Sequence, residues 1–152
     1  MANAQAFCSQ AKVDIMNGLH AFGPSVVRGA TTKDAYKAAL YLVSASRGAA
    51  DTIYSATGEV SGANYSAGGV AVTTATAPQL DSTTAHFTPS ASIVYTNVTL
   101  ATAFDAVLIY NDTSATKLAV SVHTFGSQTV TAGDFTLTMP TDDGTTGLIR
   151  MA

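Results

Sequence analysis

The sequence predicts an all-β protein with one N-terminal α-helix, folded as an antiparallel β-sandwich or jelly roll. Beyond residue 70, short segments rich in β-branched and aromatic residues alternate with turn signals about every 8–12 residues, which is typical of sandwiches. Before residue 24, apolar residues recur at helical spacing instead. The 152 residues contain no internal repeat or linker. We therefore expect one domain, with residues 1–24 as a helix or arm and residues 25–152 as the sandwich.

The helix is predicted over residues 3–22. Polar side chains fall on its other faces, and Gly23-Pro24 supplies a stop signal, because proline cannot continue a helix. The apolar stripe either lies on a sheet of the same chain or docks on a neighbouring subunit. Its residues are Phe7, Ala11, Ile15, Leu19 and Phe22.

The segment Glu59–Val72 predicts a sharp loop that leads into a strand. It places three glycines and Asn64 around one aromatic residue, Tyr65, before the alternation that begins at Val70. Glycine and asparagine tolerate positive φ, as such a loop requires. The segment contains no nucleophile with a base and no ring of metal ligands, so we interpret it as structural.

The remaining segments are assigned from their patterns. Residues 35–44 fit either a helix capped by Thr32 or a buried strand, which periodicity alone cannot distinguish. Residues 103–110 form an apolar run interrupted only by Asp105, which predicts a central strand buried on both faces. Residues 118–123 alternate, which predicts one buried face. Further strands are expected at 70–74, 86–87, 93–100, 134–139 and 148–151, with turns at 111–114, 126–127 and 142–144.

Charged residues make up only 11% of the chain, against roughly 25% in ordinary soluble proteins. The net charge is −3 without a basic stripe, so we expect no nucleic-acid partner. No apolar run approaches the roughly 20 residues of a membrane span, and we see no signal peptide. A surface with so little charge is poorly protected against association. Much of it is therefore expected to be covered by copies of itself or a larger assembly; the alternative is a monomer with a hydroxyl-rich surface.

The residues that could carry chemistry do not form a recognised motif. Cys8 lacks an activating context, and the acid inside the apolar run, Asp105, is interpreted as facing outward rather than as a buried paired carboxylate. Asp142-Asp143-Gly144 is interpreted as a tight turn rather than a calcium loop. No nucleophile elbow or phosphate loop is present, so we expect no enzyme, cofactor or metal site. The histidines, none of which has a ligand partner at close spacing, are His20, His86 and His123.

The chain contains, in this order, the segments Glu59–Gly69, Ala106–Asp112, Ala132–Leu137 and Leu148–Met151. Together these four segments resemble small tailed-bacteriophage virion proteins of the capsid decoration (cement) type. The early Phe7-Cys8 and the segment Tyr36–Tyr41 also resemble these proteins, and on that ground residues 35–44 are predicted to be a strand. The loop at residues 77–92 is unusually rich in Ala, Thr and Pro for this family, which leaves the contact surface open.

The resemblance implies a sandwich or jelly roll on the outside of a phage head that binds the shell and clamps its capsomers, without catalytic residues. The implied partners are the major capsid protein and the chain itself, as a dimer or trimer. The protein would be made in the host cytoplasm and work at the virion surface. The alternative is a head- or tail-fibre module that recognises a host glycan through Tyr65 with Asn64 or Tyr110 with Asn111-Asp112; the lack of fibre-like repeats argues against it. A polysaccharide-cleaving enzyme is a third reading and would need a carboxylate pair facing one groove.

Overall fold

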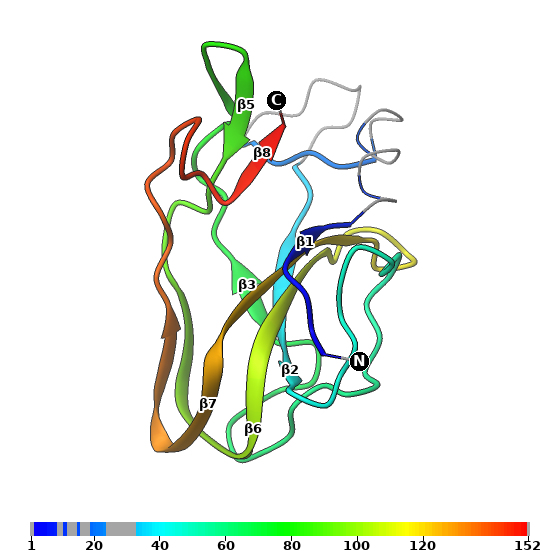
Figure 1. Cartoon of the computed structure of the whole chain (residues 1–152), viewed down its shortest axis with the longest axis vertical. Coiled ribbons are helices and arrows are strands. Elements are labelled where there is room, and N and C mark those ends of the chain that lie inside the picture. The colour runs from blue at the N-terminus through cyan, green and yellow to red at the C-terminus, as the bar shows by residue number, and fades with distance from the viewer. Residues whose placement is uncertain (1, 9–10, 12–14, 16–18, 24–32, 152) are drawn as a thin grey trace.

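The computed structural model describes residues 2–8, 11, 15, 19–23 and 33–151, and these residues form two antiparallel sheets (Figure 1). The predicted antiparallel β architecture is confirmed at this level, and the described residues contain no helix with defined bounds, only the single helical residues Ala11 and Ile15. None of them forms a helix long and apolar enough to cross a bilayer. The larger sheet has the order β1-β7-β6-β2-β3, and the smaller has the order β4-β5-β8. The strands are β1 (Ala6–Phe7), β2 (Tyr36–Leu42), β3 (Val70–Val72), β4 (Gln79–Asp81), β5 (Thr84–Phe87), β6 (Ile93–Asn111), β7 (Ala119–Leu137) and β8 (Ile149–Met151).

The two longest strands, β6 and β7, form a hairpin that bends as one ribbon near the bottom of the view in Figure 1. The pairing shifts register at several points, and Asn97 (φ 50°) and Ala132 (φ 46°) adopt the left-handed region there. The bend brings the Phe135 ring, late in β7, to 4.9 Å from the Phe104 ring and 5.4 Å from the Phe125 ring. The predicted turn at residues 126–127 is therefore wrong. The register shifts there, but β6 and β7 stay paired on both sides of these residues, as Ala106 with Thr124 and Phe104 with Gln128.

Core side chains lie on both faces of the sheet where β2, β6 and β7 meet. Alternation along β2 sends Leu40 into one buried cluster and Tyr41 into the other. Val107 and Leu108 divide in the same way, which confirms that residues 103–110 form a strand buried on both faces. Residues 35–44 contain the predicted strand, β2. The single buried face predicted for residues 118–123 is wrong, because residues 119–122 are all buried and Ser121 is only 1% exposed.

The predicted N-terminal helix is wrong at Ala6 and Phe7, which form β1 at the edge of the larger sheet, whereas Ala11 and Ile15 are helical. Ala6 and Phe7 pair with Val122 and Ser121 of β7, and the Cys8 amide donates to the Val120 carbonyl at 3.1 Å. Hydrogen bonding to an open sheet edge thus overrides the helical spacing of the apolar residues. Residues 9–10, 12–14 and 16–18 of the predicted helix, and Pro24, lie outside the described residues.

One polar side chain, Asn3, fastens the N-terminal segment beside β1. Its amide nitrogen donates to the Leu42 carbonyl at 3.0 Å and to the Asp105 carboxylate, and its carbonyl oxygen accepts from the Arg47 amide at 2.9 Å. Asp105 is the extra residue of a β-bulge, since Leu42 of β2 pairs with Phe104 while Tyr41 pairs with Ala106. The expectation that Asp105 simply faces outward is therefore corrected. It is half-buried and bonded to Asn3.

The turn predicted at residues 142–144 precedes β8, the last strand of the smaller sheet. The Asp143 carboxylate accepts from the Thr145 amide at 2.7 Å and the Thr146 amide at 2.6 Å, and these bonds lower the pKa of Asp143. The turn interpretation is confirmed. Beyond the turn the chain enters β8, whose Arg150 pairs with His86 of β5.

Candidate functional site

The glycine-rich segment is organised around the Glu59 carboxylate. Its Oε1 accepts from the Tyr65 hydroxyl and the Gly68 amide, both at 2.7 Å, and its Oε2 accepts from the Tyr54 hydroxyl at 2.6 Å. The Tyr65 oxygen also accepts from the buried Leu40 amide at 3.0 Å. Burial, together with the bond to Glu59, raises the pKa of Tyr65, so the phenol stays protonated and can donate. Tyr65 therefore attaches this loop to β2.

Positive φ angles and a close approach to the backbone of β2 explain why glycines and Asn64 occur in the same segment. Gly68, Gly69 and Asn64 have φ of 89°, 73° and 61°, which confirms the predicted positive-φ loop. A Cβ on Gly69 would lie 1.7 Å from the Ala38 carbonyl oxygen. The Asn64 side chain donates to the Asn97 carbonyl at 2.7 Å. Tyr65 and Asn64, the two residues of the first glycan-contact candidate, thus form hydrogen bonds with the chain's own backbone.

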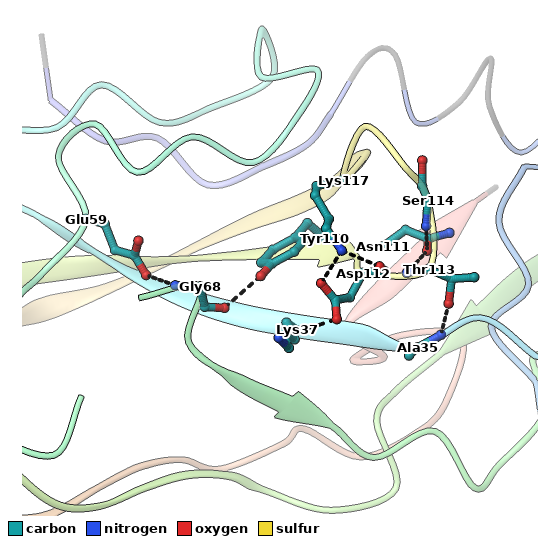
Figure 2. A network of polar contacts seen from close by, with 10 residues as sticks. All are labelled: Ala35, Lys37, Glu59, Gly68, Tyr110, Asn111, Asp112, Thr113, Ser114 and Lys117. Atoms are coloured by element: carbon teal, nitrogen blue, oxygen red, sulfur yellow. Dashed lines mark hydrogen bonds and ion pairs between the residues drawn. The ribbon is translucent and has the colours of Figure 1, made fainter. Parts of the chain in front are cut away.

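The second candidate lies at the end of the β6–β7 hairpin (Figure 2), and its Tyr110 and Asn111 are buried. Tyr110 is 2% exposed and donates to the Gly68 carbonyl at 2.8 Å, while burial raises its pKa to about 12. Asn111 is 1% exposed, and its carbonyl oxygen accepts from the Thr113 and Ser114 amides at 3.0 and 3.1 Å. These bonds fix the turn that the sequence predicts at residues 111–114. They leave neither side chain as a contact surface for a glycan.

Asp112, the third member of that candidate, is paired with two lysines. Lys117 Nζ lies 2.8 Å from one carboxylate oxygen and Lys37 Nζ lies 3.4 Å from the other (Figure 2). The Lys117 hydrogen bond is the main reason why the pKa of Asp112 is lowered. Asp112 therefore joins the hairpin loop to β2. The arrangement is an ion-pair bridge between two structural elements rather than a recognition site.

The structure does not bring the three histidines together into a metal site. His86 Nδ1 lies 3.0 Å from the Asp142 carboxylate, and His20 lies beside Asn111. His123 Nε2 lies 2.9 Å from the Ser121 hydroxyl, and burial lowers its pKa to about 4. Within the described part of the chain, no group of three or more His, Cys, Asp or Glu side chains could hold a metal ion.

Cys8 is completely buried, and burial raises its pKa to about 12. A thiol with such a pKa carries almost no thiolate at neutral pH, and the thiolate is the reactive form. The Cys8 Sγ also lies 3.7 Å from the Gly48 carbonyl oxygen. The structure therefore gives Cys8 a packing role.

An apolar row on the smaller sheet is the most prominent surface feature of the described residues. Leu80 of β4 pairs with Ala85 of β5, and Ala85 pairs with Met151 of β8, so the three side chains share one face. Leu80 is 70% exposed and Met151 is 42% exposed. We call Leu80, Ala85 and Met151 the apolar row. Buried Phe87 and Ile149 lie on the same face, so the apolar row is the exposed end of an apolar face that continues into the core.

No pattern in the sequence predicts the apolar row. Leu80 stands alone between Gln79 and Asp81 in the predicted loop at residues 77–92, and Met151 is distant in sequence. The alternation around Leu80 was the only available signal, and three residues are too few to establish a strand. The pairing of β4 with β5 and of β5 with β8 creates the row.

Comparisons of the chain with models of known protein families, with curated proteins and with solved structures find no match in any of the three.

Proposed function

We propose that this chain is a structural protein of the virion, with a β-sandwich or jelly-roll fold, that decorates the outside of a phage head and stabilises the shell. The apolar row is the observation that carries the proposal. Leu80 and Met151 are exposed on either side of Ala85, and covering their apolar surface is favourable by about 25 cal/mol per Å². We assign the apolar row to contact with the major capsid protein or with a second copy of this chain.

The low charge of the chain supports the same proposal. Only 11% of the residues are charged, which favours a surface that is shared with neighbours in an assembly. The polar residues that were candidates for glycan contact also hold loops and turns in place: Tyr65, Asn111 and Asp112 each bond to the chain itself. Such a protein needs rigid loops and a binding face, and it needs no reaction.

A decoration protein stabilises the shell through mass action. It binds the assembled shell and not its dissociated subunits, so its binding free energy opposes disassembly. When one oligomer contacts several capsid subunits, the later contacts are effectively intramolecular. Many weak contacts, each made by a surface as small as the apolar row, therefore add up to a large stabilisation.

Co-sedimentation with capsid shells that lack the protein tests the proposal. The wild-type chain is expected to pellet with the shells, to saturate at a stoichiometry fixed by the shell symmetry and to raise their disruption temperature. Leu80→Asp places a charge in the apolar row and is expected to weaken binding at least tenfold. Ile53→Asp is the matched control, because Ile53 is 46% exposed and lies outside the apolar row.

A soluble chain that stays in the supernatant with intact shells would overturn the proposed function. Equal binding by Leu80→Asp and the wild type would overturn the assignment of the apolar row. The glycan-recognition alternative gains no support from Tyr65, Asn64, Tyr110 or Asn111, since each of these side chains is bonded within the chain.

A further inference from the structure

Two cavities adjoin each other between the larger and the smaller sheet. The outer cavity has a volume of about 580 Å³ and lies between β1 and β7 on one side and β5 and β8 on the other. The inner cavity has a volume of about 240 Å³ and is lined by residues from the bent β6–β7 ribbon and the segment after it. Gln5, His123 and Leu148 line both cavities, so the two lie next to each other.

The inner cavity is lined mainly by apolar side chains, and none of the described residues that line it carries a formal charge. Three of these side chains are buried and three are half-buried, so a ligand there would contact apolar side chains while one side of the cavity stays open to solvent. The apolar side chains are Ile93, Val107, Ile109, Phe125, Leu137 and Met139. An apolar chamber with a few polar groups at its entrance is the usual form of a small-molecule site.

The outer cavity has polar and apolar lining in about equal parts, and Arg150 is the one permanently charged side chain among the described residues that line either cavity. Its Nη1 donates to the Thr145 carbonyl, which fixes the position of the guanidinium. His123, at the junction, is neutral near pH 7 because burial lowers its pKa. Asp81, beside the lining residue Gly144, accepts from the Gly144 amide at 3.3 Å.

We infer that the two cavities form one binding site for an aliphatic carboxylate, such as a straight-chain fatty acid. Its carboxylate binds the Arg150 guanidinium, and its chain enters the inner cavity. Arginine matches a carboxylate with two parallel hydrogen bonds, and each buried methylene contributes about 0.8 kcal/mol. The apolar chamber and the single cation at its mouth together select this ligand class. The inference stands independently of capsid binding.

Methionine-methyl NMR on the full-length protein tests the site. The chain has four methionines, and Met139 is the one among the described residues that lines the inner cavity. With ¹³C-methyl methionine, titration with decanoate below its micellar concentration is expected to shift the Met139 signal saturably. Met139→Leu, a volume-conserving change, assigns that signal. Decanol serves as the uncharged probe and is expected to bind at least tenfold more weakly than decanoate.

Charge variants test the role of Arg150. Arg150→Gln is expected to weaken decanoate binding at least tenfold and to change decanol binding less than twofold. Lys117→Gln is the matched control, because it removes a cation from the β6–β7 hairpin loop and should leave both affinities unchanged. A melting temperature close to that of the wild type shows that each variant is folded.

Three results would overturn the inference: no saturable shift of Met139, equal affinities for decanoate and decanol, or equal losses in Arg150→Gln and Lys117→Gln. No shell is present in these titrations. Failure here therefore leaves the capsid proposal standing, and failure of co-sedimentation leaves the ligand site standing.

Discussion

Replacement of Gly69 by alanine tests the contact between the glycine-rich loop and β2. The new Cβ would lie 1.7 Å from the Ala38 carbonyl oxygen and 2.5 Å from its carbon, at a φ of 73°. Ala38 cannot move aside easily, because it pairs with Val70 of β3 and with Ile109 of β6. Either β3 separates from β2 or the loop is remodelled.

The expected loss of stability has two contributions. The left-handed conformation costs alanine about 1–2 kcal/mol relative to glycine. Displacement of the backbone from a paired strand adds about 2 kcal/mol, so Gly69→Ala should lower the free energy of unfolding by about 3–4 kcal/mol. In a chain of this length, 1 kcal/mol corresponds to about 2–4 °C, so the melting temperature should fall by roughly 10 °C.

Urea and thermal unfolding followed by circular dichroism measure these values, and two other glycines separate the contributions. In Gly62→Ala the new Cβ would lie 1.9 Å from the Thr99 carbonyl oxygen but without a left-handed φ, so this variant reports the close approach alone. Gly126→Ala meets nothing within 4 Å and should be neutral or stabilising by about 0.5–1 kcal/mol. If Gly69→Ala unfolds within about 0.5 kcal/mol of Gly126→Ala, the reasoning fails.

Two further predictions concern hydrogen bonding and pH. Tyr65→Phe removes the hydrogen bonds to Glu59 and to the buried Leu40 amide and should lower the free energy of unfolding by about 2–3 kcal/mol. Tyr54→Phe removes only a hydrogen bond to Glu59 and should lower it by about 1 kcal/mol. Similar urea midpoints for the two variants would contradict this difference. Burial lowers the pKa of His123 from 6.5 to about 4, so the folded protein holds this imidazole neutral. The contribution of neutral His123 to the free energy of unfolding is fully present above pH 6.5. It falls by about 3 kcal/mol as the pH is lowered to about 4, because the unfolded chain takes up the proton first. His123→Gln should flatten that part of the stability–pH curve, and an unchanged curve would disprove the assignment.

The predictions that succeeded rest on side-chain chemistry that acts locally. Gly68 and Gly69 needed positive φ, Asn111 bonded the amides of its own turn, and Asp143 did the same before β8. The strand Tyr36–Leu42 was assigned correctly through its resemblance to other sequences, since its pattern also fitted a helix. Local rules therefore specified most turns and many of the strands.

The predictions that failed depend on partners that are distant in sequence. Ala6–Phe7 fitted a helix until the edge of β7 offered hydrogen bonds, and residues 126–127 resembled a turn until β6 kept pairing past them. The apolar row and the two cavities likewise arise only when the strands of two sheets are placed. Local patterns therefore identified the turns at residues 111–114 and 142–144 and could not locate β4, which lies in the predicted loop at residues 77–92, or the surfaces formed between distant strands.

The bent hairpin also has a consequence for how the chain folds. Pairing of β6 with β7 closes only the loop at residues 112–118, whereas pairing of β1 with β7 must close more than a hundred residues. The entropy of loop closure therefore favours early formation of the hairpin tip near Tyr110 and Ala119, before β1 and β2 add to its two sides. Until they arrive, both long edges are open to pairing with other chains. Newly made chains should be most prone to aggregation during that interval.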